Sequence, residues 1–209
     1  MTSEQTPPPP AAQPQGGEAK TKEPARKPEA TDASDHPWVR SLRDALPEAF
    51  VSAKEFARQV TLTVRRESIA QVARHLKNVQ DFRYCVDVTA VDWRDRQPRF
   101  DVVYHFYSFS KNDRIRVKCG AADGEEVPSI ATVYLAANWP ERETYDMFGI
   151  RFTGHPDLRR ILTWEGFHGH PLRKDFPVEG IDTGAAIYPE EWPEGGGPSS
   201  DDPNRKVVS

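Results

Sequence analysis

The residues best suited to chemistry in this chain lie between Trp139 and Asp175, where charged and aromatic side chains are interleaved. Two carboxylates on one face of a helix can act as general acid and base, and the spacing of Glu143 and Asp146 allows this. Glu141 adds a third carboxylate within the same helical stretch. Charges among aromatic rings are tolerated inside a protein only when they are paired and hydrogen-bonded. We therefore interpret the stretch as a polar network, within this chain or against a partner, in preference to a catalytic site.

A metal site is a second use for polar residues in this stretch. Glu165, His168 and His170 belong to residue types that commonly bind metal ions. The pattern lacks a well-placed third ligand beside the two histidines, so we expect no metal here. His155 precedes Pro156, and we expect it to cap a turn or to join the polar network.

Other cofactor signatures are missing from the sequence. Cys85 and Cys119 are its two cysteines, whereas an iron–sulfur cluster usually takes four, and no CxxC pair suggests zinc. We expect both to be buried strand residues in a reducing compartment. Neither a Walker pattern nor a dinucleotide fingerprint is present, so we expect no NADH site in this chain. The basic residues of the stretch are expected to pair with carboxylates rather than bind phosphate: Arg159, Arg160, Arg173 and Lys174.

Length and charge narrow the class of protein. The chain has 209 residues and a formal net charge of -4, which suits one domain with tails. A general nucleic-acid binder usually presents a basic face, so we expect no nucleic acid as a partner. The longest apolar run, residues 130–139, is far shorter than the ~20 residues that span a bilayer. Any membrane association is therefore expected to be peripheral and indirect.

We divide the chain into one α+β domain over residues 36–187 and two tails. Residues 1–35 are rich in proline and contain no Val, Ile, Leu or aromatic residue. Such a segment cannot bury enough apolar surface to offset the entropy lost on ordering. We expect this tail and the polar residues 188–209 to be disordered.

Two helices are predicted in the first half of the domain. Pro37 in the first turn and Asp35 as the cap predict a helix over residues 37–46. Apolar residues at helical spacing predict a second helix over residues 68–78, capped by Ser68. The ambiguous residues 51–59 are interpreted as loop or helix.

Strands are predicted over residues 60–64, 84–93, 100–109 and 114–120. The last of them alternates apolar and basic residues, as expected of an antiparallel sheet with one covered face. The two strands before it are apolar on both faces, which predicts a more central position. The apolar set of the last strand is Ile115, Val117 and Cys119, and its basic set is Arg114, Arg116 and Lys118.

The second half of the domain is predicted to be helical and then irregular. We expect helices over residues 130–137 and 138–148, a left-handed cap at Gly149, a short strand at 150–152, a turn or helix over 155–162 and irregular chain from 163. Long irregular segments are often functional or lie along a partner. The predicted fold is a mostly antiparallel sheet of about four to five strands with helices on one side and an irregular C-terminal extension.

Two runs in this sequence, ERETYDMFGIRFTGHPDLRRIL and GHPLRKDFP, resemble the signature of a known family. That family is the C subunit of the proton-pumping NADH:quinone oxidoreductase, respiratory complex I. The resemblance extends over about residues 60–179 and includes the VYHFYS and VPSIATVYLAANWP segments.

The resemblance implies a structural subunit of the peripheral arm, which supports electron transfer from NADH to quinone coupled to proton translocation. It implies that FMN, iron–sulfur clusters and quinone are bound by other subunits. The implied partners are the homologue of the D subunit and other subunits of the arm, on the cytoplasmic side of the cell membrane. None of the matching residues is expected to be catalytic. They form a structural network or a partner interface: Glu141, Arg142, Glu143, Tyr145, Asp146, Phe148, Gly149, His155, Pro156, Arg160, His170, Arg173, Lys174 and Asp175.

Two alternatives stay open from the sequence. Related subunits occur in membrane-bound hydrogenases and in other quinone- or ferredoxin-linked dehydrogenases, so the same fold could serve another complex. A free-standing acid–base enzyme would use Glu143 and Asp146 in an open cleft.

Overall fold

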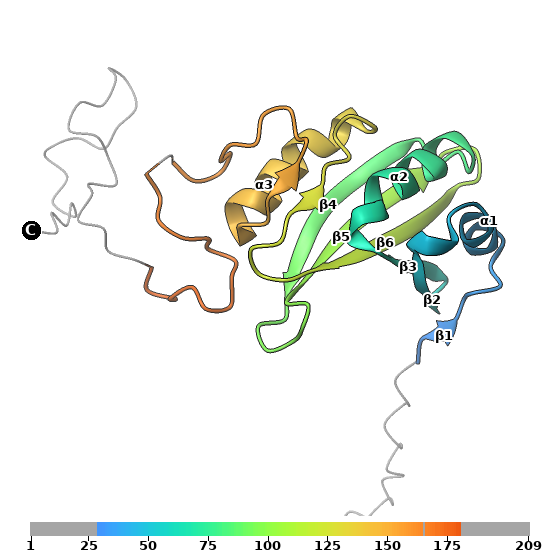
Figure 1. Ribbon diagram of the computed structural model, residues 1–209, viewed down its shortest axis with the longest axis horizontal. Helices are drawn as coiled ribbons and strands as arrows, with labels where there is room; N and C mark the ends of the chain where they lie inside the picture. Colours follow the sequence, from blue (N-terminus) through green and yellow to red (C-terminus); the bar gives the residue numbers. More distant parts are fainter. Residues whose placement is uncertain (1–28, 165, 181–209) are drawn as a thin grey trace, which may run out of the picture.

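The computed structural model describes residues 29–164 and 166–180 (Figure 1). Most of the two expected tails lies outside these residues. Where the N-terminal tail overlaps them, strand β1 (Thr31–Asp32) pairs antiparallel with β2 (Phe50–Phe56), and Ala33 is buried. Folded chain therefore begins before the expected boundary at residue 35. β1 is held mainly by backbone pairing, which an apolar pattern does not reveal.

The protein is built on one six-stranded sheet in the order β1-β2-β3-β6-β5-β4. Its other strands are β3 (Gln59–Val64), β4 (Tyr84–Asp92), β5 (Phe100–Ser108) and β6 (Asp113–Ala121). All neighbours are antiparallel except β3 and β6, which run parallel. The α+β class and the mostly antiparallel sheet are confirmed. The sheet is larger than expected because residues 51–59, interpreted as loop or helix, form β2 and the start of β3.

Two helices cover one face of the sheet (Figure 1). α1 (Pro37–Ala45) packs beside α2 (Ile69–Asn78), and both expected helices are confirmed. α2 turns its apolar stripe of Ile69, Val72, Ala73 and Leu76 into the core. β6 buries the apolar set of its alternation and leaves Arg114, Arg116 and Lys118 on the other face, as expected.

The expected helix caps are corrected in part. His36, rather than Asp35, occupies the N-cap position of α1, and Ser68 occupies that of α2 as expected, but neither side chain makes a capping hydrogen bond. Ser68 belongs to the short 3-10 turn η2 (Arg66–Ser68) and has helical backbone angles, unlike the extended backbone that a capping serine usually adopts.

β4 is an edge strand, which corrects the central position expected from its apolar residues. Its free side is covered by η3 (Leu135–Ala137) and α3 (Asn138–Phe148) rather than by another strand. The Thr144 hydroxyl donates to the Val88 carbonyl at 3.1 Å and so satisfies an acceptor on this edge. The apolar character of β4 therefore reflects contact with a helix.

The helix expected over residues 130–137 does not form. Residues 131–133 make a turn, and only η3 is helical. The backbone N–H of Ile130 and the hydroxyl of Ser129 donate to the carboxylate of Glu141, so these donors are satisfied without a helix. β7 (Val127–Pro128) pairs with β8 (Phe152–Thr153), close to the strand expected at 150–152.

Of the remaining expectations for the second half of the domain, some are confirmed and others are not. α3 and its left-handed cap at Gly149, with φ of 76°, are confirmed. Residues 155–162 form turns without a helix, and the described part of the segment after 163 is irregular, as expected.

Candidate functional site

The carboxylate of Asp146, at the end of α3, is the centre of the polar network. It is fully buried and accepts hydrogen bonds from the Thr163 hydroxyl at 2.5 Å and the Arg160 guanidinium at 2.7 Å. The backbone N–H groups of Ile161, Leu162 and Thr163 also donate to it, at 3.1, 2.8 and 2.8 Å. One side chain therefore fixes the path of a loop that has no regular structure.

These donors decide the charge of Asp146. Burial alone would raise the pKa of the carboxyl, but hydrogen bonds from Thr163, Leu162 and Arg160 outweigh it and hold the pKa well below its usual range. Asp146 is therefore an anion throughout the neutral range and holds no proton to give. The stability that it adds is present above the pKa of an unfolded aspartate and is lost as pH falls toward the lowered pKa.

Arg142 supports the same loop from the preceding turn of α3. Its guanidinium donates to the carbonyls of Arg159 and Arg160, both at 3.1 Å. Arg142 lies four residues before Asp146 on α3, but the guanidinium that pairs with Asp146 is that of Arg160. Arg142 acts instead as a donor to loop carbonyls.

The C-terminal end of α3 makes a second set of contacts with the segment 170–173. The His170 ring donates from Nδ1 to the backbone carbonyl of Asp146 at 2.8 Å and lies edge-on to Tyr145. Arg173 donates to the carbonyl of Phe148 at 2.6 Å. A side chain on Gly149 would meet the His170 ring at 2.6 Å, so both the positive φ and the close approach require glycine there.

A second buried carboxylate, that of Asp92 at the end of β4, holds the segment farther along. Arg99 donates to it through two nitrogens at 2.7 and 2.8 Å, and the backbone N–H of Lys174 donates at 2.9 Å. Arg99 also pairs with Asp175 at 2.8 Å. The Arg99 hydrogen bonds keep the pKa of Asp92 well below its usual range despite burial. Asp123 completes this cluster by pairing with Arg173 at 2.9 Å.

Glu141 is buried in a different way, without a guanidinium partner. Its side chain is fully buried and accepts from the Ser129 hydroxyl at 2.5 Å and the Ile130 N–H at 2.7 Å. His155 Nε2 lies 3.9 Å away but donates to the Asn138 carbonyl, while its Nδ1 accepts from Asp157 N–H. Burial outweighs the hydrogen bonds from Ser129 and Ile130 and raises the pKa of Glu141 to about 7.

The predicted site residues thus fall into groups. Those that hold the C-terminal segment are Arg142, Tyr145, Asp146, Phe148, Gly149, Arg160, His170, Arg173, Lys174 and Asp175, with Lys174 contributing its backbone N–H. Glu141 and His155 form the separate cluster at the start of α3. Glu143 and Pro156 are exposed. Among the charged residues of α3, Asp146 forms an ion pair with Arg160, whereas Arg142 binds backbone carbonyls and Glu143 has no ion pair within the described residues.

Ion pairing of the basic residues is confirmed for three of the four. Arg159 pairs with Asp157, Arg160 with Asp146 and Arg173 with Asp123. Sequence reasoning missed Asp92, Arg99 and Asp123, whose partners in the C-terminal segment lie about 50 to 80 residues away in the chain. No local pattern could have indicated them.

The geometry of the described residues supports neither the metal site nor the acid–base site considered above. Among residues 29–164 and 166–180, no three His, Cys, Asp or Glu side chains are grouped to hold a metal ion, and Glu165 lies outside the described residues. Glu143 is exposed whereas Asp146 is fully buried and saturated with donors, so they do not share an open cleft. Cys85 and Cys119 are buried strand residues, as expected. Within the described ranges no helix has the length and hydropathy needed to cross a membrane.

Comparison with known proteins gives consistent results. Residues 62–182 match the family described as respiratory-chain NADH dehydrogenase, 30 Kd subunit. The NADH-quinone oxidoreductase C subunit of Rhodobacter capsulatus is 54% identical over 136 residues, 64% of this chain and 68% of that one. The protein of the same name from Geobacter metallireducens is 46% identical over 144 residues, 68% of this chain and 89% of that one. A solved chain of the membrane-bound sulfane sulfur reductase, an archaeal respiratory membrane complex, is 25% identical with a TM-score of 0.58, over 67% of this chain and 84% of that one.

The role of Asp146 can be tested by replacing it with asparagine. We expect Asp146→Asn to lower the free energy of unfolding by about 3 kcal/mol, because the amide NH2 would face several N–H donors and Arg160 would lose its counter-charge. The measurement is urea denaturation at pH 7. Asp157→Asn is the matched control, since the Asp157–Arg159 pair is largely exposed and should change stability by less than about 0.5 kcal/mol. Equal effects of the two substitutions would contradict the account.

The raised pKa of Glu141 predicts that its contribution to the free energy of unfolding depends on pH with the opposite sign to that of Asp146. Because its folded pKa of about 7 lies above the ordinary value of 4.5, the folded state binds more protons between these values. Stability should therefore fall as pH rises from 4.5 through 7, by roughly 3 kcal/mol from this group. Glu141→Gln should remove that part of the slope in denaturation curves recorded across the range. Glu143→Gln, at an exposed position, should leave the slope as it is, and a slope unaffected by Glu141→Gln would refute the assignment.

Proposed function

The chain belongs to the respiratory-chain NADH dehydrogenase 30 Kd subunit family, and we propose that it acts as a structural and assembly subunit in the peripheral arm of NADH:quinone oxidoreductase. The family resemblance expected from the sequence motifs is confirmed by this match. As a subunit of complex I, the chain supports electron transfer from NADH to quinone and the coupled proton translocation. In this proposal it carries no step of the chemistry itself.

One observation carries the structural role: most polar residues of the family signature, though not Glu143, bind one another or the backbone. Asp146 holds the loop at 161–163, and Arg142 holds the carbonyls that precede it. A catalytic acid or base must reach a substrate, whereas Asp146 is fully buried. The network is therefore suited to fixing the shape of a surface.

We infer that FMN, the iron–sulfur clusters and quinone are bound by other subunits of the complex. The sequence supports this inference because it lacks the glycine fingerprint and the cysteine sets of such sites. We further infer that the homologue of the D subunit is the principal partner. In this arrangement the chain lies on the cytoplasmic side of the membrane and reaches the membrane through the complex.

A second candidate is the equivalent place in another respiratory membrane complex. The likeness to a chain of the archaeal sulfane sulfur reductase favours it, at 25% identity. The curated relatives named as C subunits of NADH-quinone oxidoreductase are 42% to 55% identical and favour the first candidate. Purification of the tagged chain from its native membranes, followed by mass spectrometry of the subunits that accompany it, decides between the two.

The structural role predicts that Arg142→Ala lowers the amount of assembled complex and leaves its turnover intact. The substitution removes two charged hydrogen bonds to loop carbonyls, worth about 2 kcal/mol, so the incorporated fraction should fall several-fold. Native gels give the amount of complex, and NADH:quinone activity divided by that amount gives its turnover.

Arg159→Ala is the control for this experiment, because Arg159 is exposed and pairs with the exposed Asp157. It should assemble like the unmodified chain. A full amount of complex with reduced activity in Arg142→Ala would argue against a purely structural role.

A further inference from the structure

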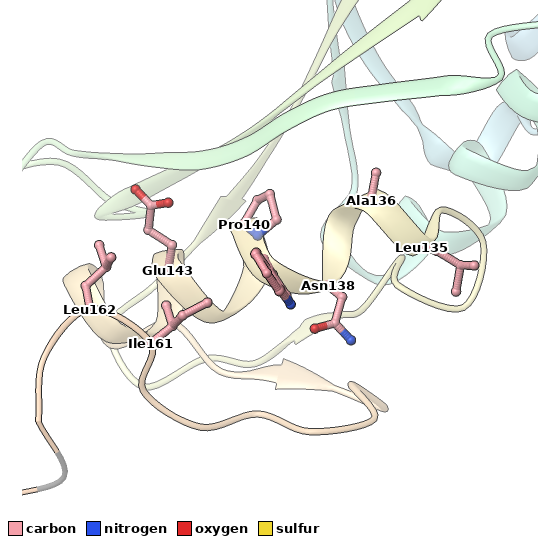
Figure 2. Close-up of a pocket in the computed structure, with 8 residues that line it drawn as sticks. Leu135, Ala136, Asn138, Pro140, Glu143, Ile161 and Leu162 are labelled. Carbon is pink, nitrogen blue, oxygen red and sulfur yellow. The ribbon is translucent and has the colours of Figure 1, made fainter.

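A groove lies between the first turn of α3 and the loop that Asp146 holds (Figure 2). Its volume is about 880 Å3. The lining is apolar, with Leu135, Trp139, Pro140, Ile161 and Leu162, and it contains one charged side chain, that of Glu143. In Figure 2, Leu135 and Leu162 lie toward opposite ends of the row of lining residues.

Large apolar side chains of this groove are exposed to an unusual degree. Leu135 is 87% exposed, Trp139 70% and Leu162 63%. Apolar residues gathered in one exposed patch mark interaction sites, and tryptophan is enriched among the residues that dominate binding energy. Because the three residues come from η3, α3 and the following loop, the patch is a product of the fold.

The walls of the groove are fixed before any partner arrives. Ile161 and Leu162 form one wall, and their backbone N–H groups are bound by the Asp146 carboxylate. Trp139 and Pro140 form the other wall, in the first turn of α3. A surface ordered in advance loses less entropy on binding.

The charge of the groove indicates the chemistry of its occupant. Within the described residues the side chain of Glu143 has neither a hydrogen bond nor an ion pair. The basic side chains nearest to it in the chain and across the loop are committed elsewhere, since Arg142 binds carbonyls and Arg160 binds Asp146. A lone carboxylate beside an apolar groove is complementary to a cation among apolar side chains.

We propose that this groove docks a segment of another subunit of the same complex, which places apolar side chains against Trp139 and Leu162 and a Lys or Arg against Glu143. The proposal rests on the proposed function, because it requires a partner subunit. A second copy of this chain, or its own residues 181–209, would be a competing occupant.

The occupant can be identified by photocrosslinking in the assembled complex. p-Benzoylphenylalanine is incorporated at position 135, and at position 79 as the control, because Val79 is also exposed, at 66%, but lies at the end of α2. Irradiation of native membranes should link position 135 to one peptide of another subunit that contains apolar residues and a Lys or Arg. Crosslinks to this chain, to lipid alone or to no partner, in a complex of full composition, would overturn the proposal.

The ionic contact is tested separately. Glu143→Arg should lower the amount of assembled complex by about tenfold, and Glu143→Gln by about threefold. Replacing the crosslinked Lys or Arg by Glu should restore assembly in Glu143→Arg. Unchanged assembly in Glu143→Arg would overturn the pairing. Unaltered thermal unfolding of the purified chain confirms that the exposed substitution leaves the fold intact.

These results separate the two proposals from each other. If the chain co-purifies with no oxidoreductase subunits, the proposed function fails whatever position 135 contacts. If the complex has its full composition but position 135 links elsewhere, the docking groove fails and the structural role stands.

Discussion

The structure of the C-terminal half depends on one constraint, the need of the buried Asp146 carboxylate for hydrogen-bond donors. An ionised group without them could not stay in the interior. The donors come from three successive backbone N–H groups, a hydroxyl and a guanidinium. Because three of these donors are backbone N–H groups, their hydrogen bonds to Asp146 fix the path of the loop at 161–163. The buried Asp92 carboxylate likewise accepts hydrogen bonds from Arg99 and from the backbone N–H of Lys174, so the irregular segment is held at two separate points.

The rest of the fold provides the platform for these two points. α3 lies on the free side of β4 and presents Asp146, while the end of the same strand presents Asp92. Glu141 is buried as deeply but has no guanidinium beside it, and burial raises its pKa. Three carboxylates thus differ in charge because of their donors. Asp146 and Asp92 hold the C-terminal segment and Glu141 holds residues 129–130, while the loop that Asp146 holds forms one wall of the apolar groove.

The sequence predicts the local elements of this protein better than its long-range contacts. α2, β6 and the Gly149 cap follow from periodicity, alternation and the conformational freedom of glycine. The helix expected over residues 130–137 does not form, and the contact of Ser129 with Glu141, twelve residues along the chain, is one that the local pattern does not indicate. The charged and aromatic residues around Asp146 in the sequence identify it as a site residue. They do not identify its partner, because tertiary packing brings Arg160, rather than Arg142, to its carboxylate.

Amide hydrogen exchange in the purified full-length chain tests the central claim most directly. The N–H groups of Ile161, Leu162 and Thr163, and that of Lys174, lie in irregular chain and are bound by buried carboxylates. If Asp146 and Asp92 hold the segment, these amides exchange as slowly as those in the middle of α3. Exchange at the rate of an unstructured peptide would contradict the claim that the two carboxylates fix this surface.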